Sequence, residues 1–242
     1  MTKRFLIFQH LEVEHPGIFR TFMQEEGIAW DTVEFEHNEV IPDLRNYAAL
    51  IVMGGPMDVW EEAKYPWLKK EKEFIQEAVV QLGMPFLGLC LGHQLLAESL
   101  GGQCGQSDSP EVGVLRVELT GQGPEGIIFD GLPETFCCLQ WHSAEVKEMP
   151  AGAECLATSP DCRIQAMSWG PRAYSTQFHL EVEDETIDNW VKVPAYYEAL
   201  CSALGPQGAQ TLNAACKAQM SRFAEMAERF YINWLHASSK TR

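Results

Sequence analysis

The chain has 242 residues, of which 46% are hydrophobic, enough to bury the core of one large domain. Its 34 acidic and 18 basic residues give a formal net charge of −16. A surface this acidic repels phosphate backbones and anionic membrane surfaces, so the composition argues against nucleic-acid and membrane partners.

The apolar runs and the cysteines bear on the location of the protein. Residues 5–8 are too short for a signal-peptide core, and no apolar run approaches the length of a membrane span. We therefore expect a cytoplasmic protein. The eight cysteines include no C-x-x-C pair and no Cys/His cluster with zinc-ligand spacing. We expect reduced thiols, without a disulfide framework and without a metal site.

Short apolar runs alternate with helical patterns in the first hundred residues. Strands are expected at 5–8, 32–35, 49–53 and 86–89. Helices are expected at 15–26, 67–82 and 91–100. The run at 49–53 is apolar enough for burial on both faces of a sheet. This alternation predicts a mostly parallel, doubly wound sheet.

The next section reads as strands separated by turns, and we expect antiparallel or mixed additions to the sheet there. These strands are expected at 112–119, 136–139, 154–158, 164–168 and 173–178. After Glu183 the chain is helical again, with a stripe of apolar residues at helical spacing. The stripe consists of Leu212, Cys216, Phe223, Ala227, Phe230 and Trp234. It predicts a terminal helix packed on the sheet rather than a partner-binding helix.

No repeat, low-complexity tract or long linker divides the chain. We therefore expect one domain, 1–242, in which 1–190 form the core and 191–242 form a C-terminal helical cap. The predicted architecture is α/β with three layers.

The segment 86–94 ends a strand, presents a cysteine and begins a helix. Gly88 and Gly92 stand two positions before and after Cys90, which is the cysteine version of the G-x-S-x-G nucleophile elbow. Glycines are needed there because side chains would collide with neighbouring elements. A helix N-terminus stabilises a thiolate and presents free N–H groups, so the Leu91 N–H is a candidate oxyanion donor. The alternative is a buried structural cysteine at a tight turn.

A thiolate nucleophile needs a base, and His179 is the best placed of the seven histidines. It follows the expected strand at 173–178 and precedes Glu181 by two positions. Residues i and i+2 of an extended segment face the same side, so Glu181 can hold the ring and its tautomer. His93 lies on the elbow helix itself, too close along the chain to face Cys90 easily.

Gly54, Gly55 and Pro56 follow the buried run at 49–53. Consecutive glycines allow a backbone N–H to approach a ligand closely. A second oxyanion donor is expected in a loop at the carboxyl end of a neighbouring parallel strand. A plain tight turn is the alternative for this loop taken alone.

These three segments, in this order, resemble the motifs of the class I glutamine amidotransferases, the triad-type glutaminase family. The resemblance covers residues from about 1 to 190 and implies that family's fold, with no cofactor and no metal. The stretches at 139–142 and 177–182 are most similar to a stand-alone branch that resembles the glutaminase domain of GMP synthase.

The resemblance implies a role for each site residue. Cys90 would attack the γ-carbonyl of glutamine or a γ-glutamyl amide and form a γ-glutamyl thioester. His179 would act as base and then acid, oriented by Glu181. The N–H groups of Gly55 and Leu91 would bind the oxyanion. The substrate-binding positions would be Gly54, Gln94 and His142.

Some positions depart from the family's pattern. Leu180 replaces the usual proline but keeps the two-residue spacing, so we expect the triad to survive. Ala144 stands where the branch near GMP synthase often carries aspartate, which weakens the expectation that His142 binds substrate in the usual way. Asp58 and Trp60 are expected to be ordinary loop residues rather than part of the pocket mouth.

Two enzymatic functions remain open, because the chain has no P-loop motif and no room for a synthase domain. A free-standing γ-glutamyl hydrolase would release glutamate and ammonia or an amine from a small-molecule γ-glutamyl substrate. We slightly favour it because the chain ends in what resembles a closed helical cap. A glutaminase subunit would instead supply ammonia to a separate synthase or ligase chain. A non-catalytic regulatory relative is the third hypothesis, and the intact Cys90, His179 and Glu181 argue against it.

Overall fold

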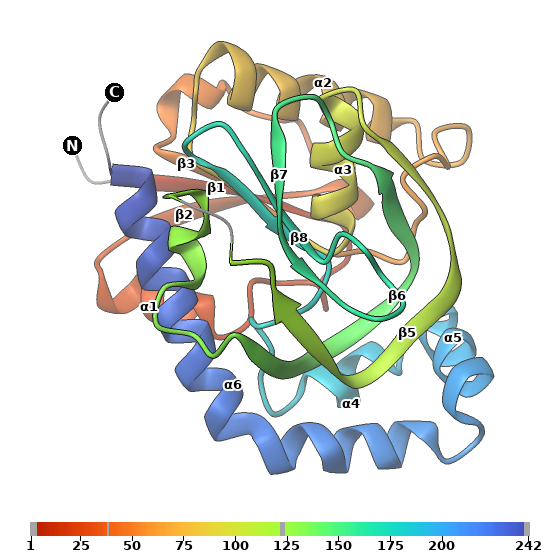
Figure 1. Cartoon of the computed structure of the whole chain (residues 1–242). Helices are drawn as coiled ribbons and strands as arrows, with labels where there is room; N and C mark the ends of the chain where they lie inside the picture. The colour runs from red at the N-terminus through yellow and green to blue at the C-terminus, as the bar shows by residue number, and fades with distance from the viewer. Residues whose placement is uncertain (1–3, 38, 122–123, 240–242) are drawn as a thin grey trace.

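The computed structural model describes residues 4–37, 39–121 and 124–239 (Figure 1). The strands are β1 (Arg4–Gln9), β2 (Ala29–Glu34), β3 (Ala49–Val52), β4 (Phe86–Leu89), β5 (Gln103–Leu119), β6 (Thr135–Glu148), β7 (Ala153–Thr158), β8 (Ala166–Trp169) and β9 (Ala173–Thr176). The α-helices are α1 (Phe19–Glu25), α2 (Trp67–Gln76), α3 (Leu91–Ser99), α4 (Thr186–Trp190), α5 (Pro194–Leu204) and α6 (Gly208–Ser239). Short helical turns are η1 (Phe35–His37), η2 (Leu44–Asn46), η3 (Glu77–Gln81) and η4 (Pro124–Phe129).

The described strands form one sheet in the order β2-β1-β3-β4-β9-β8-β7-β5-β6. The first five strands of this order are parallel. The remaining neighbours pair antiparallel, and the long β5–β6 ribbon curls away from the parallel part (Figure 1). The predicted doubly wound sheet with added antiparallel strands is confirmed.

Both faces of the parallel strands are buried, as alternation along β1 shows. Phe5 and Ile7 join a core that contains residues of α1 and α6. Leu6 and Phe8 point the other way, into a core that contains residues of α2 and α3. The two helix pairs lie on opposite sides of the sheet (Figure 1), which confirms the three-layer architecture.

The apolar stripe near the end of the chain faces the sheet, as predicted. Phe223, Phe230 and Trp234 of α6 are buried in the same core as β1. The Trp234 indole N–H donates to the Phe86 carbonyl at 3.2 Å. The division into a core and a helical cap stays a prediction, and residues 240–242 of that cap lie outside the described part.

The β5–β6 ribbon is longer than predicted. β5 begins at Gln103 rather than 112, and β6 continues to Glu148 rather than ending at 139. Residues 103–110 are largely exposed and polar, so they lack the apolar alternation that predicts a strand. Pairing across the ribbon, such as Gln103 opposite Glu148, supplies the missing order.

The helices are shorter than their sequence patterns. α1 begins at Phe19 rather than 15, and the α-helical part of 67–82 ends at Gln76, where the π-helical turn η3 follows. In the described part of the chain, no helix has the combination of length and apolar character needed to cross a membrane. The eight cysteines all lie in this part and are free thiols.

Candidate active site

Cys90 occupies the sharp turn between β4 and α3, where the sequence predicts a nucleophile elbow. Its φ of 52° and ψ of −102° make it the only non-glycine residue with positive φ among those described. Such a conformation costs about 1–3 kcal/mol and persists only where the surroundings enforce it. The Cys90 N–H donates to the Thr176 carbonyl at 2.8 Å, which fixes the turn against β9.

The two elbow glycines are required sterically. A Cβ on Gly88 would lie 2.5 Å from the Gly92 carbonyl oxygen, and a Cβ on Gly92 would lie 2.2 Å from the Val52 carbonyl oxygen. Both contacts are with backbone atoms, which cannot rotate away as the end of a side chain can. The predicted reason for the glycines around Cys90 is confirmed.

His179 and Glu181 meet beside Cys90. The Nδ1 atom of His179 lies 2.6 Å from Glu181 Oε1, and both side chains are buried. Burial lowers the pKa of His179, but the charge of Glu181 and a side-chain hydrogen bond with Cys90 outweigh it and hold that pKa well above its ordinary value. Because Nδ1 is occupied by Glu181, Nε2 is the nitrogen left to interact with the thiol. An edge-on contact with Trp190, with ring centroids 4.8 Å apart, restrains the imidazole.

Leu180 does not disturb this arrangement. It is buried in the apolar core, while its neighbours on either side pair with each other. The His179 N–H donates to the Leu139 carbonyl at 2.9 Å, an isolated antiparallel bridge in a chain that bends after β9 ends at Thr176. The predicted contact of His179 with Glu181 therefore forms without proline, although the segment is bent rather than a regular strand.

A cavity of about 460 Å³ opens over the elbow. Cys90, Leu91 and Gly55 line it on the side of the sheet. The wall opposite includes residues of α5, namely Ala195, Tyr196, Ala199, Ser202 and Ala203. Asp58 also lines the cavity, contrary to the expectation for this loop, together with Pro56 and Met57 before it. Trp60 does not line it.

Gly54 and Gly55 differ in their surroundings. Gly55 lines the cavity, and Gly54 does not. A Cβ on Gly54 would lie 2.6 Å from Glu14 Oε2 and 3.4 Å from the His179 ring. The close packing at Gly54 is therefore with buried protein groups, and its predicted contact with substrate stays a prediction.

Gln94 lies at the cavity, held by neighbouring protein groups. Its amide nitrogen donates to the Ala144 carbonyl at 3.2 Å and to Gln177 Oε1 at 3.1 Å. Gln177 in turn donates from Nε2 to Cys90 Sγ at 3.5 Å. Gln177 was not among the predicted site residues, although it stands only two positions before His179.

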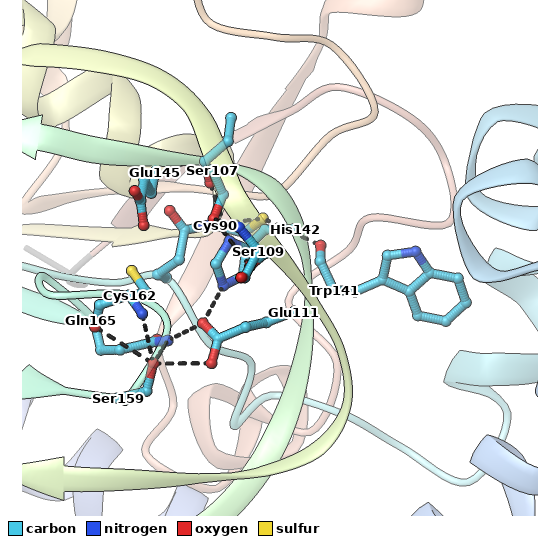
Figure 2. A network of polar contacts seen from close by, with 12 residues as sticks. Cys90, Ser107, Ser109, Glu111, Trp141, His142, Glu145, Ser159, Cys162 and Gln165 are labelled. Atoms are coloured by element: carbon cyan, nitrogen blue, oxygen red, sulfur yellow. Dashed lines mark hydrogen bonds and ion pairs between the residues drawn. The ribbon is translucent and has the colours of Figure 1, made fainter. Parts of the chain in front are cut away.

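His142 lines the cavity with both ring nitrogens already occupied. Nδ1 contacts the Ala144 carbonyl at 3.0 Å, and Nε2 contacts Glu111 Oε2 at 3.1 Å. Glu111 also accepts from Ser159 at 2.8 Å and from Gln165 at 2.7 Å, which completes the buried network in Figure 2. The ring nitrogens of His142 are thus unavailable to a substrate in this arrangement.

This network contains the one group of potential metal ligands found among the described residues. Donor atoms of Glu111, His142 and Cys162 lie within 4.8 Å of one another, although no spacing in the sequence indicates it. The carboxylate of Glu111 is already satisfied by three hydrogen-bond donors, and burial raises the pKa of the Cys162 thiol. Metal binding would have to replace these hydrogen bonds and deprotonate that thiol.

Glu14 and Tyr196 form a second buried pair beside the triad, which no pattern in the sequence indicates. The Tyr196 hydroxyl donates to Glu14 Oε1, while Glu14 Oε2 has no partner among the described residues. Burial raises the pKa of Glu14, and the nearby His179 opposes this effect. The pair connects α5 to the site over 182 positions of sequence.

Glu181→Gln is expected to lower the pKa of His179, because it removes the carboxylate charge that raises this pKa. We expect kcat to fall roughly 10²- to 10⁴-fold, since the amide also weakens control of the tautomer. An NMR titration of the imidazole and steady-state kinetics would measure the two effects. Glu183→Gln, which alters only a half-buried pair with Arg20, is the matched control. An unchanged titration of His179 would count against the role of Glu181.

Comparison with known protein families places this geometry in context. A family model described as glutamine amidotransferase class-I matches residues 19–191. The glutamine-hydrolysing GMP synthase of Aeropyrum pernix is 36% identical over 151 residues, which are 60% of this chain and 27% of that protein. In Sulfolobus acidocaldarius, one subunit of the glutamine-hydrolysing GMP synthase is 30% identical over 169 residues, 67% of this chain and 85% of that subunit. The chain thus spans little more than a quarter of the first relative but most of the second.

Solved structures have the same fold. A glutamine amidotransferase from Thermotoga maritima superposes with a TM-score of 0.86 at 26% identity, over 99% of this chain and all of that one. A glutamine amidotransferase from Methylobacillus flagellatus also gives 0.86, at 24% identity, over 100% of this chain and 98% of the other. These superpositions extend over α5 and α6, beyond the residues that the family model matches.

Proposed function

Because the chain belongs to the class I glutamine amidotransferase family, we propose that it hydrolyses the γ-amide of glutamine or of a γ-glutamyl amide. The reaction is acyl transfer through a covalent γ-glutamyl thioester on Cys90. The observation that carries the proposal is the contact of a strained elbow thiol with an imidazole braced by a carboxylate, at the floor of a cavity.

Acylation begins when Cys90 gives its thiol proton to His179 Nε2 and its Sγ attacks the γ-carbonyl carbon. The C–S bond forms, and the carbonyl electron pair moves onto oxygen. The N–H groups of Gly55 and Leu91 stabilise this oxyanion. The tetrahedral intermediate then expels the amine, which takes a proton from His179 Nε2, and the γ-glutamyl thioester remains.

Deacylation uses the same groups with water as the nucleophile. His179 accepts a proton as water attacks the thioester carbonyl, and the second oxyanion occupies the same pair of N–H donors. Collapse breaks the C–S bond and releases glutamate, and the proton returns to the Cys90–His179 pair. Glu181 holds the ring orientation throughout.

A free-standing γ-glutamyl hydrolase is the function that we favour, because α5 closes one side of the cavity. Cavities of about 300–1,000 Å³ hold drug-sized ligands, so one of about 460 Å³ has room for a γ-glutamyl group with a small amine attached. Most of its lining is apolar, and Asp58 is a charged group at its edge. Apolar amines and amines that carry a second cationic group are the candidates for the released product.

The second candidate is a glutaminase subunit that supplies ammonia to a separate synthase or ligase chain. The matches to individual subunits of glutamine-hydrolysing GMP synthases favour it. A small-molecule γ-glutamyl substrate is common to both candidates. The cytoplasmic location and the lack of nucleic-acid and membrane partners stay predictions from the composition.

Assays of the purified chain separate these functions. Glutamate release would be measured from glutamine and from a panel of γ-glutamyl amides, with and without cell extract. Turnover by the chain alone supports the free hydrolase, and turnover of glutamine only in extract supports the subunit. An inactive chain under every condition would support the non-catalytic alternative.

Ala199→Leu tests the substrate wall that α5 provides. The larger side chain would project into the cavity, and overpacking costs about 1–3 kcal/mol, or roughly 5- to 150-fold in kcat/KM. We expect this loss for γ-glutamyl amides with bulky amines and a smaller one for glutamine. Glu198→Leu, exposed on the same helix and outside the cavity lining, is the matched control. Equal losses for all substrates would contradict a role of α5 in selectivity.

A further inference from the structure

A buried histidine forms a hydrogen bond with the peptide that joins Gly54 to Gly55, on the side away from the cavity. The Gly54 carbonyl oxygen lies 2.7 Å from Nδ1 of His10, the residue that follows β1. This peptide is trans, so its carbonyl and its N–H point in opposite directions. With the carbonyl directed at His10, the Gly55 N–H is directed away from His10, on the side where Gly55 lines the cavity.

Both nitrogens of the His10 ring face acceptors. Nε2 lies 3.0 and 3.2 Å from the two carboxylate oxygens of Glu71 on α2, and Nδ1 faces the Gly54 carbonyl. A carbonyl can only accept, so Nδ1 carries a proton and donates to Gly54, and the carboxyl of Glu71 favours a second proton on Nε2. Burial lowers the pKa of His10, but Glu71, the Gly54 carbonyl and the more distant Glu14 outweigh it and leave this pKa raised.

The pair has little freedom to move. The side chains of His10 and Glu71 are fully buried. The imidazole packs against two aromatic rings, Phe35 at 5.6 Å and Trp67 at 5.4 Å between centroids, and these two rings stack on each other at 4.9 Å. A charge-assisted hydrogen bond from a ring held by this packing and by Glu71 defines one orientation of the Gly54 carbonyl.

The Gly54–Gly55 loop needs such a restraint because glycines have no side chain to limit rotation of the peptide. On the opposite side, the Gly92 N–H donates to the Met53 carbonyl at 3.2 Å, which ties the start of this loop to the elbow helix. The Met53 carbonyl is thereby fixed, and the following peptide, between Gly54 and Gly55, is the first in the loop that this bond leaves able to rotate. Rotation of this peptide would replace a hydrogen-bond donor at the cavity with a carbonyl oxygen.

We propose that His10 and Glu71 are positioning residues for catalysis, which hold the Gly55 N–H toward the cavity as an oxyanion donor. This inference rests on the proposed function, since it assigns the pair to the acyl-transfer step of that reaction. Neither residue contacts the substrate, because the Gly54–Gly55 peptide stands between them and the cavity. Their effect is therefore on the transition state, with little effect on substrate binding.

The test compares acyl transfer with alkylation of the same thiol in three variants. His10→Leu removes the donor, and His10→Asn places an amide donor near the position of Nδ1. Glu71→Gln leaves the size of that side chain unchanged but removes its charge. The readouts are kcat and KM for the best substrate, the rate at which iodoacetamide labels Cys90, and the midpoint of thermal unfolding.

For His10→Leu we expect kcat to fall roughly 10²-fold, the loss typical of one oxyanion donor, with KM within about threefold. His10→Asn should recover about 10-fold of this loss. Iodoacetamide reacts by displacement and forms no oxyanion, so labelling of Cys90 should stay within about twofold of wild type. Glu71→Gln should lower kcat about 10-fold. If His10→Leu does not fold, the comparison of Glu71→Gln with wild type decides the test.

Two results would overturn the inference while the proposed function stands. One is an active wild type whose folded variants keep kcat within about threefold. The other is a parallel loss of turnover and alkylation, which would indicate a general disorder of the site. An inactive wild type that also binds no γ-glutamyl compound would overturn the proposed function itself.

Discussion

Cys90→Ala is expected to abolish turnover, with kcat reduced roughly 10⁴- to 10⁶-fold, because no other described thiol lies beside His179. The substitution removes one atom from a cavity wall and leaves the backbone turn in place. The rest of the cavity lining would still bind substrate, so KM should change much less than kcat. Glutamate release under single-turnover and steady-state conditions would measure the loss.

Two companion variants make this result specific. Cys137→Ala, at a half-buried thiol on β6 outside the cavity, should retain wild-type activity. Cys90→Gly should be as inactive as Cys90→Ala yet unfold at a temperature higher by about 2–8 °C, because glycine relieves the positive φ. Wild-type turnover by Cys90→Ala would remove this thiol from the mechanism.

Gly92→Ala is expected to have the largest effect on stability. The added Cβ would lie 2.2 Å from the Val52 carbonyl oxygen and 2.9 Å from its carbonyl carbon. Val52 belongs to a fully buried strand between two other strands, so neither side can yield without a shift of the sheet. We expect a loss of about 3 kcal/mol or more, and an unfolding midpoint lowered by roughly 6–12 °C.

Activity of Gly92→Ala should fall as well, because displacement of α3 carries the Leu91 N–H and Cys90 away from the glycine loop. Gly105→Ala is the matched control, since the nearest atom to a Cβ there would be Lys147 Cγ at 3.4 Å, an ordinary van der Waals distance. Thermal unfolding followed by circular dichroism measures both variants. Equal midpoints would contradict the steric account of the elbow.

The proposed catalytic constellation could be inferred from the sequence because each part of it is local. The elbow depends on Gly88, Cys90 and Gly92 within five positions. The second half of the constellation depends on the two-residue spacing of His179 and Glu181, whose side chains meet at 2.6 Å. The glycine spacing at the elbow and the His-x-Glu spacing both depend on local backbone conformation. The contact between imidazole and carboxylate could therefore be predicted from the sequence.

The alternating apolar pattern likewise predicted the parallel strands and the face that α6 buries. The exposed part of the β5–β6 ribbon was missed, because its order comes from cross-strand pairing and not from an apolar face. The role of Asp58 at the cavity was missed for a similar reason. A loop residue has no periodic pattern from which its surroundings can be inferred.

Patterns in the amino-acid sequence were thus sufficient for the parallel sheet, the strained thiol at the end of a strand, and the histidine braced by an acid. The buried pairs that pack next to these residues could be identified only in the tertiary structure. His10 meets Glu71 across 61 positions, and Glu14 meets Tyr196 across 182. Local conformation depends on neighbours within a few residues, whereas such contacts depend on the order in which strands join the sheet and on the helices packed against it.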